Sequence, residues 1–352
     1  MVASVRFRFV TSTPLDIRRG SGTYVGTQVL GRALEALGHM VHFETPLTHF
    51  PVYTFERWWF NRGLRPSSDF DFTIGFDMDG YRIADIASLK GVIADEVRFE
   101  SGLMRFTMGL QARYEKLHVE RARTVLATSC YSAHRAQEFY GLKESPAVVP
   151  ELIDLQEWRR ALAAAQPAKS GKFIVLFVGR FYRRKRVDVL LRAAATLRRR
   201  IPDLEVRIVG NGPCGANLRA LARELKLENT VVWLGDVSRT ALAEAYNRAA
   251  VFCLPSVQEG FGIVLLEAMA AGKPIVAARA GAIPETAPQA VLAEPDNAEA
   301  LAAGIERLYA SFELRMAQSA AGARWVERFD ASRVAQLFLE AITPARATYI
   351  SV

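Results

Sequence analysis

Two acidic side chains flank a short glycine-containing segment in the C-terminal half of the chain. Glu259 ends a loop, Gly260 and Gly262 free the backbone, and a helix is expected to begin near Ile263. The first turn of a helix has unpaired N–H groups and a partial positive charge, so it favours an anion. Glu267 lies about one turn inside this helix among apolar residues, where a carboxylate is unfavourable unless hydrogen-bond donors meet it. Two ribose hydroxyls could be those donors, and so could the guanidinium of a nearby arginine.

A basic loop earlier in the chain could supply charges for the same anion. Residues 173–178 form an apolar run typical of a buried parallel strand, Gly179 ends it, and Arg180 follows. Lys185 comes shortly afterwards, before the next expected helix. Arginine presents two parallel N–H donors and lysine a compact charge, and together they suit a diphosphate. Because basic loops are common, a solvent-exposed loop without a ligand is the alternative interpretation.

A glycine-rich turn follows the next expected strand. Gly210, Asn211 and Gly212 come directly after residues 206–209. Glycines at this place allow the backbone to approach a flat ligand closely, although a tight turn would need them as well. Taken alone, this motif favours the turn.

The elements between these loops predict a parallel sheet in each half of the chain. In the C-terminal half, the sequence predicts strands at 173–178, 206–209, 231–234, 251–254 and 274–277, separated by helices. In the N-terminal half, it predicts strands at 5–10, 40–44, 70–74, 91–94 and 124–127, a helix at 24–37, and Ser129 as a helix N-cap. Strands that alternate with helices form a parallel sheet covered on both faces, and ligands bind at the carboxyl ends of its strands.

The length of 352 residues indicates two domains rather than one core. The expected N-terminal domain spans 1–165, and the expected C-terminal domain spans 166–331. A polar stretch within 163–172 is the expected linker between them. Two doubly wound domains joined there are expected to form a cleft at the carboxyl ends of their strands.

The composition excludes several classes of protein. Half of the residues are hydrophobic and 23% are charged, as in soluble globular proteins. No apolar run approaches the ~20 residues that span a bilayer, and the first residues lack a signal-peptide pattern, so a cytoplasmic protein is expected. The cysteines and histidines lack metal-ligand spacing, and the expected element order contradicts a metal-binding role for Asp77-Met78-Asp79. Neither a metal nor a permanently bound cofactor is expected.

The net charge of +8 is concentrated in one region. Residues 159–200 contain thirteen basic side chains and a single acidic one, Asp188. Such a cluster attracts phosphates, acidic lipids or nucleic acid. No recognised nucleic-acid-binding module accompanies the cluster, so no nucleic-acid partner is expected.

Three motifs occur together in the order typical of a known enzyme family. They are Gly179-Arg180 with Lys185, then Gly210-x-Gly212-Pro213, then Glu259 and Glu267 separated by seven residues. On these motifs the chain resembles glycosyltransferase family 4, whose members transfer a sugar with retention of anomeric configuration. The resemblance implies an α/β structure of the GT-B fold, with two Rossmann-like doubly wound domains facing across a cleft. It covers nearly the whole chain and is strongest at 173–285.

The resemblance implies a role for each of these residues. Arg180, Lys185 and Glu259 would be catalytic, since the first two would hold the donor's diphosphate and Glu259 would contact the transferred sugar. Glu267 would bind the ribose hydroxyls. The other donor-binding residues implied are Gly22, Thr23, Gly179, Gly210, Asn211, Gly212, Val237, Gly260, Phe261, Gly262, Ile263 and Val264. The final helix, within 332–352, would cross back onto the N-terminal domain.

The N-terminal half departs from the family pattern at two places. A histidine usually follows about the fourth strand of this half, close to the transferred sugar. The strand expected at 91–94 is followed instead by Asp95 and Glu96, which become the candidate contacts to the sugar or the acceptor. The asparagine common before the linker is replaced by Glu151.

The expected substrates are a nucleotide-diphosphate sugar, with UDP- and GDP-sugars favoured, and a carbohydrate or glycolipid acceptor. The resemblance places the reaction in bacterial polysaccharide or glycolipid synthesis. Residues 53–62 mix aromatic and basic side chains, which could contact the inner face of the cell membrane, although core packing and an acceptor-facing loop are favoured. The alternatives to a transferase are a GT-B sugar-nucleotide epimerase and a sugar-nucleotide-binding subunit without turnover.

Overall fold

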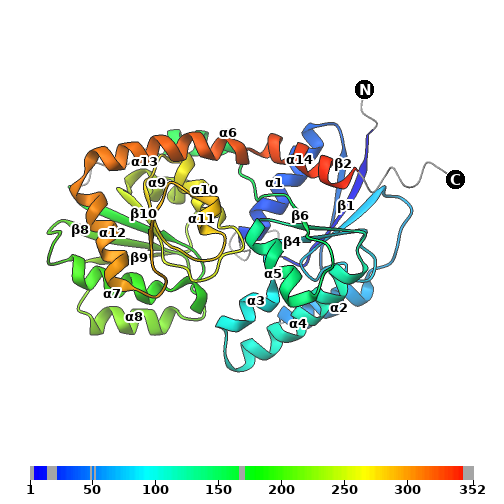
Figure 1. The fold of residues 1–352 in the computed structure, drawn as a ribbon, viewed down its shortest axis with the longest axis horizontal. Helices are drawn as coiled ribbons and strands as arrows, with labels where there is room; N and C mark the ends of the chain where they lie inside the picture. Colours follow the sequence, from blue (N-terminus) through cyan, green and yellow to red (C-terminus); the bar gives the residue numbers. More distant parts are fainter. Residues whose placement is uncertain (1–3, 14–21, 48–49, 51–52, 166–170, 344–352) are drawn as a thin grey trace. The chain divides into compact units, whose positions relative to one another are not determined.

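The structure of the chain is a computed structural model that describes residues 4–13, 22–47, 50, 53–165 and 171–343 (Figure 1). It divides into two compact units. The N-terminal unit comprises Met1–Leu152 together with Ala331–Val352, and the C-terminal unit comprises Ile153–Asp330. Each unit contains a parallel six-stranded sheet with helices packed on it. Within the described ranges, every helix is too short or too polar to cross a lipid bilayer.

The sheet of the N-terminal unit has the strand order β2-β1-β3-β4-β5-β6, and its neighbouring strands are parallel. The strands are β1 (Arg6–Val10), β2 (Met40–Glu44), β3 (Phe72–Phe76), β4 (Ile86–Leu89), β5 (Thr124–Ala127) and β6 (Ala147–Val148). The helices are α1 (Gly22–Ala36), α2 (Tyr53–Gly63), α3 (Ile93–Glu96), η1 (Val97–Phe99), α4 (Gly102–Arg121), α5 (Cys130–Tyr140) and α14 (Ala331–Ile342). The central strands are buried on both faces, so they appear in the sequence as runs of mostly apolar residues.

The core of the N-terminal unit includes a helix from the far end of the sequence. Phe338 on α14 lies against Phe7 and Phe9 of β1, with ring centroids 6.0 and 6.5 Å apart. α14 also packs on α1, so the two helices cover the same face of the sheet. The last helix therefore completes a core that begins with the first strand, as the resemblance implied.

The sheet of the C-terminal unit has the strand order β12-β11-β10-β7-β8-β9, and its neighbouring strands are also parallel. The strands are β7 (Phe173–Val178), β8 (Leu204–Val209), β9 (Val231–Gly235), β10 (Val251–Leu254), β11 (Ile275–Ala278) and β12 (Val291–Ala293). The helices are α6 (Leu155–Ala164), η2 (Arg183–Lys185), α7 (Val187–Leu197), α8 (Gly215–Glu224), α9 (Arg239–Arg248), α10 (Ile263–Ala270), α11 (Ile283–Thr286), α12 (Ala298–Ala310), α13 (Phe312–Trp325) and η3 (Val326–Phe329). The loops after β7 and β10 lie side by side because these two strands are neighbours.

One predicted strand of the N-terminal unit is wrong. The strand expected at 91–94 is instead β4, which ends at Leu89, and α3 begins at Ile93. β4 is buried along its whole length because β3 and β5 lie on either side of it. The apolar residues Val92 and Ile93 are also buried, but as the start of a helix. Lys90, rather than Asp95 or Glu96, is therefore the residue that directly follows the fourth strand.

Two further features of the N-terminal unit bear on the sequence predictions. Ser129 is confirmed as the N-cap of α5, where its hydroxyl accepts a hydrogen bond from the Ser132 N–H at 3.0 Å. The 20-residue helix α4 was not predicted. Its inner face carries Gln111, Glu115 and His118, so the apolar periodicity that reveals most helices is missing.

The boundary between the units comes earlier in the sequence than the expected linker. α6 belongs to the C-terminal unit, where the fully buried Trp158 donates its indole N–H to the Glu267 carbonyl at 3.1 Å. The stretch 163–172 therefore begins inside α6, and its residues 166–170 lie outside the described ranges.

We expect Phe338→Ala to lower the free energy of unfolding by about 3–5 kcal/mol, because it opens a cavity between β1 and α14. Urea denaturation followed by circular dichroism measures the change. The control is Leu337→Ala on the same helix. Leu337 is 38% exposed, so this substitution should lower the free energy of unfolding much less. Equal losses from the two variants would contradict the packing of α14 on β1.

Candidate functional site

The most direct contact between predicted site residues joins Lys185 to Glu259. Lys185 ends η2 after β7, and Glu259 lies in the loop after β10. The lysine ammonium donates to Glu259 Oε1 at 2.6 Å, and both side chains are largely buried. A backbone hydrogen bond of 2.9 Å from the Val257 N–H to the Arg184 carbonyl holds the same two loops together. The structure thus brings together two residues that the sequence placed at separate motifs.

The surroundings of Glu259 keep its carboxyl group ionised. Burial by itself would raise the pKa of Glu259, but the charges of Lys185 and Arg184 outweigh burial and hold this pKa below its ordinary value. An ionised carboxylate is an acceptor only, so Glu259 can bind the hydroxyl groups of a ligand but cannot donate to them.

The backbone of Glu259 is fixed by a close approach from the loop after β11. The Ala282 N–H donates to the Glu259 carbonyl at 3.0 Å. Gly281 adopts a left-handed φ of 57°, and a Cβ atom there would lie 2.6 Å from the Glu259 carbonyl oxygen. Any side chain at Gly281 would therefore displace Glu259, which explains the glycine at this position.

The amino end of α10 lies just beyond Glu259, and its N-cap residue has no side chain that could cap the helix. Gly262 is its N-cap residue, with a φ of 91° that favours glycine. Gly262, Ile263 and Val264 are partly exposed, whereas Phe261 is buried in the core. This helix end can offer N–H groups and a partial positive charge to an anion.

The glycine turn after β8 packs directly on the loop after β7. The Phe181 N–H donates to the Asn211 carbonyl at 2.9 Å. A Cβ atom at Gly210 would lie 2.1 Å from the Gly179 carbonyl oxygen, and one at Gly212 would lie 2.5 Å from the Phe181 nitrogen. Both glycines are therefore needed for loop packing, which is the interpretation that the motif alone favoured.

Two other predicted residues lie near this turn. Val237 follows β9 and packs half-buried against the core of the unit. The Gly210 N–H donates to the Gly235 carbonyl at 2.7 Å, so the loops after β8 and β9 are neighbours. Arg180 directly follows Gly179 and is partly exposed, and its side chain has no ion pair with another described residue.

Glu267 is buried on α10 and is met by two side chains that the sequence interpretation did not name. Arg239, at the start of α9, approaches Glu267 Oε1 at 3.4 Å, and the Tyr246 hydroxyl donates to Glu267 Oε2 at 3.0 Å. The Arg239 guanidinium also stacks 4.3 Å from the ring centroid of Trp158. Burial raises the pKa of Glu267, although Arg239 and the Tyr246 hydroxyl act in the opposite direction. The ion pair with an arginine, one of the two interpretations of Glu267, is thus present.

The predicted site residues of the N-terminal unit occupy three different settings. Gly22 and Thr23 form the first turn of α1, and the preceding residues 14–21 lie outside the described ranges. Asp95 on α3 is fully buried, accepts from Arg98 and Arg135 at 3.0 and 2.8 Å, and also accepts from the Tyr131 hydroxyl at 2.6 Å. Glu96 is half-buried. The carboxylate of Asp95 is therefore already engaged by three donors.

The two departures from the family pattern are in contact with each other. Lys90 takes the place after the fourth strand, and its ammonium lies 3.2 Å from Glu151 Oε2. Both side chains are almost wholly buried. Burial raises the pKa of Glu151, and the charge of Lys90 opposes this effect. The Glu151 carboxylate lies against α1, since a Cβ atom at Gly26 would be 2.1 Å from Oε2. Lys90 and Glu151 thus form one buried ion pair.

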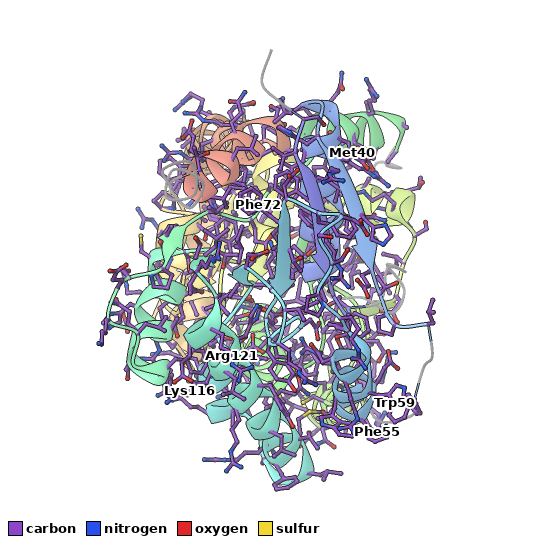
Figure 2. All side chains as sticks on the ribbon, turned by 90° about the vertical axis from the view of Figure 1, so that its right-hand side faces the viewer. Met40, Phe55, Trp59, Phe72, Lys116 and Arg121 are labelled. Carbon is purple, nitrogen blue, oxygen red and sulfur yellow. The ribbon has the colours of Figure 1, made fainter. Side chains whose placement is uncertain are left out.

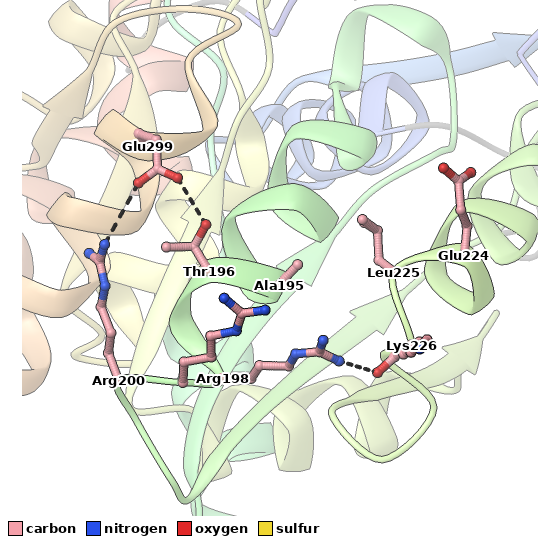
Figure 3. Close-up of a pocket in the computed structure, with 9 residues that line it drawn as sticks. Ala195, Thr196, Arg198, Arg200, Glu224, Leu225, Lys226 and Glu299 are labelled. Atoms are coloured by element: carbon pink, nitrogen blue, oxygen red, sulfur yellow. Dashed lines mark hydrogen bonds and ion pairs between the residues drawn. The ribbon is translucent and has the colours of Figure 1, made fainter.

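A pocket of about 650 Å³ in the C-terminal unit contains none of the predicted site residues (Figure 3). It lies where α7 ends, whereas the site lies where α7 begins. Among its lining residues, Glu299 accepts from the Thr196 hydroxyl at 2.9 Å and lies 4.0 Å from Arg200. Over the described ranges, no group of three or more histidine, cysteine or acidic side chains is arranged to hold a metal ion.

Sequence reasoning named Lys185 and Glu259, which the structure brings together, but it did not identify Arg239 and Tyr246 as the partners of Glu267. Arg239 and Tyr246 lie on a helix whose apolar positions only suggest packing, and nothing in their spacing points to Glu267. The pairing of Lys90 with Glu151 was also missed, because the strand that precedes Lys90 was placed a few residues too late. Had the strand been predicted to end at Leu89, Lys90 would have been the candidate residue directly after the fourth strand.

Comparison with known proteins finds a family model that matches the C-terminal unit. Residues 159–325 match the model of a family described as glycosyl transferases group 1. A D-inositol 3-phosphate glycosyltransferase from Nocardiopsis dassonvillei is 34% identical over 215 residues, which are 56% of this chain and 50% of that protein. One from Saccharomonospora viridis is 30% identical over 251 residues, which are 67% of this chain and 58% of that protein. The chain thus spans about half the length of these relatives.

Solved structures of similar fold cover nearly the whole chain. Sucrose-phosphate synthase from Thermosynechococcus elongatus has a TM-score of 0.79 and 21% identity, and the match covers 98% of this chain and 100% of that one. HepE from Anabaena, in complex with UDP and glucose, has a TM-score of 0.72 and 18% identity, with 97% and 100% covered. These likenesses show that the chain has the two-domain α/β GT-B fold. Residues 159–325 match a glycosyl transferases group 1 domain, and the relatives of the chain are transferase enzymes.

We expect Lys90→Met and Glu151→Gln each to lower the free energy of unfolding by about 3–5 kcal/mol, because each leaves one buried group without its partner. The double variant Lys90→Met/Glu151→Gln should recover most of this loss, since it removes both charges together. Chemical denaturation of the four proteins measures the coupling. Additive losses in the double variant would show that the two side chains do not interact.

Proposed function

We propose that the protein is a retaining glycosyltransferase of family 4, a hexosyltransferase of EC class 2.4. It transfers a sugar from a nucleotide-diphosphate donor to a hydroxyl group of a carbohydrate or glycolipid. The observation that carries this proposal is the contact of Lys185 with Glu259 beside the uncapped amino end of α10. A diphosphate needs fixed positive charge, and a sugar needs an ionised acceptor for its hydroxyls, and this arrangement supplies both.

The donor's diphosphate binds at the carboxyl edge of the C-terminal sheet. Arg180, Lys185 and the first N–H groups of α10 converge on it with charges and dipoles of the required sign. Negative charge accumulates on the departing diphosphate in the transition state, so donors fixed by the fold stabilise that state more than the ground state. An oxygen of the departing phosphate takes the proton of the acceptor hydroxyl as the new bond forms on the same face.

The ribose of the donor binds Glu267. In the structure, Arg239 and Tyr246 donate to the two oxygens of this carboxylate. The ribose hydroxyls offer the same kind of donor, so they compete with Arg239 for Glu267 Oε1. The Tyr246 hydroxyl holds Oε2 and fixes the direction in which the carboxylate points. Donor binding therefore replaces the ion pair between Arg239 and Glu267 with hydrogen bonds from the ribose hydroxyls to Glu267.

The names of similar proteins support the choice of substrates. HepE was solved with UDP and glucose, which favours a UDP-sugar as the first donor to test. The names of the D-inositol 3-phosphate glycosyltransferases include inositol 3-phosphate, a molecule with hydroxyl groups, which favours a hydroxyl acceptor here. We place this protein in the cytoplasm of a bacterium, in polysaccharide or glycolipid synthesis, with catalysis that needs no metal. Unchanged turnover after treatment with EDTA is the test of the last point.

We expect Arg180→Ala and Lys185→Ala each to reduce kcat by roughly 10²–10³, equivalent to about 2–4 kcal/mol of transition-state stabilisation. Release of UDP or GDP from a matching sugar donor, measured with a panel of hydroxyl acceptors, gives the rates. Arg192→Ala, which removes an exposed arginine of α7, is the matched control and should leave the rate unchanged. Wild-type rates in both site variants would refute the assignment.

The same measurements separate the alternatives. Turnover of the donor into an epimer without an acceptor would indicate an epimerase. Binding of UDP or GDP in a calorimeter without any turnover would indicate a binding subunit.

We expect Glu267→Gln to weaken UDP binding about tenfold or more, because hydrogen bonds to a charged acceptor are worth about 1.5–3 kcal/mol each. The main kinetic effect should be a higher KM for the donor, since the ribose does not react. Isothermal calorimetry with UDP measures the affinity, and Glu224→Gln on the exposed side of α8 is the control. An unchanged affinity of the Glu267→Gln variant for UDP would show that the ribose does not bind this carboxylate.

A further inference from the structure

The carboxylate of Glu267 has two donors that hold it with different firmness. The Tyr246 hydroxyl donates to Oε2 at 3.0 Å, and this tyrosine is fully buried. Arg239 Nη1 donates to Oε1 at 3.4 Å, and the arginine side chain is 28% exposed. Hydrogen bonds between a cation and a carboxylate are usually about 2.7–2.9 Å long, so the contact of Arg239 is a loose one. Oε2 therefore has a fixed partner, whereas the partner of Oε1 can be exchanged.

Arg239 is held in place by contacts other than its ion pair with Glu267. Its guanidinium stacks 4.3 Å from the ring centroid of Trp158 on α6. Trp158 is itself fully buried, and its indole N–H donates to the Glu267 carbonyl at 3.1 Å. The backbone of Arg239 begins α9 directly after Ser238, whose hydroxyl caps the helix by accepting from the Ala241 N–H at 3.2 Å. Arg239 can therefore release Oε1 and still remain beside the carboxylate.

The place of Arg239 in its helix is electrostatically unfavourable. A cation in the first turn of a helix faces the positive end of the helix dipole, and Arg239 is the first residue of α9. Its Nε atom is buried and has no hydrogen-bond partner among the described residues. The Glu267 carboxylate is the acidic group with which Arg239 pairs. This pairing, rather than the needs of α9, accounts for an arginine at this position.

Loss of the donor at Oε1 would weaken Glu267 as an acceptor. Glu267 is only 6% exposed, and burial raises its pKa. Without a donor at Oε1, the carboxyl group would bind a proton more readily and would lose acceptor capacity. A ligand that lacks one of the two ribose hydroxyls would impose this penalty on a site in which Tyr246 was the sole partner. Arg239 prevents the penalty if it stays on Oε1.

We propose that Arg239 makes the nucleotide site tolerant of 2′-deoxyribose, so that the sugar donors include 2′-deoxyribonucleoside diphosphate sugars. With a ribonucleotide, a ribose hydroxyl displaces Arg239 from Oε1. With a 2′-deoxyribonucleotide, the remaining 3′-hydroxyl binds the carboxylate, and Arg239 keeps its hydrogen bond to Oε1. Thymidine diphosphate sugars thereby join uridine and guanosine diphosphate sugars as donors of a suitable chemical class.

The inference rests on the proposed binding of the donor ribose to Glu267. It adds one quantity, the ratio of the affinities for a ribonucleotide and for its 2′-deoxy analogue. In the wild-type site, the hydrogen bond from the 2′-hydroxyl replaces an existing contact, so the gain in affinity is small. In a site without Arg239, the same hydroxyl meets a buried oxygen that has lost its donor, so the gain is that of a full hydrogen bond to a charged acceptor.

The test is isothermal calorimetry of the full chain with UDP and 2′-deoxy-UDP, and with GDP and 2′-deoxy-GDP, so that the result does not depend on the base. We expect the wild-type protein to bind the deoxynucleotide no more than about fivefold more weakly than the ribonucleotide, because the ion pair offsets the lost hydroxyl. Arg239→Met should increase this ratio about tenfold, mainly through weaker binding of the deoxynucleotide. Methionine keeps an unbranched side chain against Trp158.

Two further variants separate this role from a structural one. Arg248→Met is the matched control, because Arg248 lies at the other end of α9 and pairs with Glu244 at 3.2 Å. It should leave both affinities unchanged. Arg239→Lys keeps a positively charged donor near Oε1 and should keep the ratio close to that of the wild-type protein. A structural role of Arg239 would weaken the binding of both nucleotides equally, which would leave the ratio unchanged.

The outcomes distinguish this inference from the proposed function. Circular dichroism shows whether each variant is folded, and the wild-type ratio tests the inference even if Arg239→Met is not. Binding of UDP or GDP with a wild-type ratio well above the expected limit would overturn the inference alone, and so would a ratio that Arg239→Met leaves unchanged. Absence of binding of all four nucleotides by the folded wild-type protein would overturn the donor site itself, and the inference with it.

Discussion

The contact between Lys185 and Glu259 is the interaction on which the candidate site depends. Each ion is largely buried, and a buried charge is strongly unfavourable unless an opposite charge meets it. Because one residue follows β7 and the other follows β10, this requirement fixes the distance between two loops at the edge of the sheet. The same contact sets the chemistry, since Lys185 and Arg184 lower the pKa of Glu259 against the effect of burial. The position of the two loops and the ionisation of Glu259 therefore depend on the same ion pair.

The same constraint acts at the other buried carboxylates and explains why they lie where they do. Glu267 carries a raised pKa because burial outweighs the help of Arg239 and Tyr246, so it is the less strongly ionised of the two site acids. Asp79 has four donor groups and holds α2 by its polar face. A carboxylate with a full set of donors positions an element, whereas one whose donors can be exchanged for those of a ligand can take part in binding.

The orientation of α2 (Tyr53–Gly63) follows from this rule, since its polar side chains Glu56, Arg57 and Asn61 are buried. Once Arg57 and Asn61 turn inward to satisfy Asp79, the aromatic residues of α2 have no place in the core (Figure 2). The polar inner face and the aromatic outer face of α2 are thus two consequences of one buried charge.

The sequence by itself determined five of the six strands of the C-terminal unit, but not β12 or the helices α12 and α13. The predicted strands appear as short apolar runs, and glycines mark several of the loops that follow them. The order of these elements and the positions of Glu259 and Lys185 in their loops therefore followed from pattern alone. Only the tertiary structure decided which charges pair. Lys90 and Glu151 are separated by two strands and two long helices, and Arg239 reaches Glu267 from a different helix. Hydrophobic periodicity reports how an element meets the core, but the pairing of buried charges depends on distances across the fold, which no local pattern encodes.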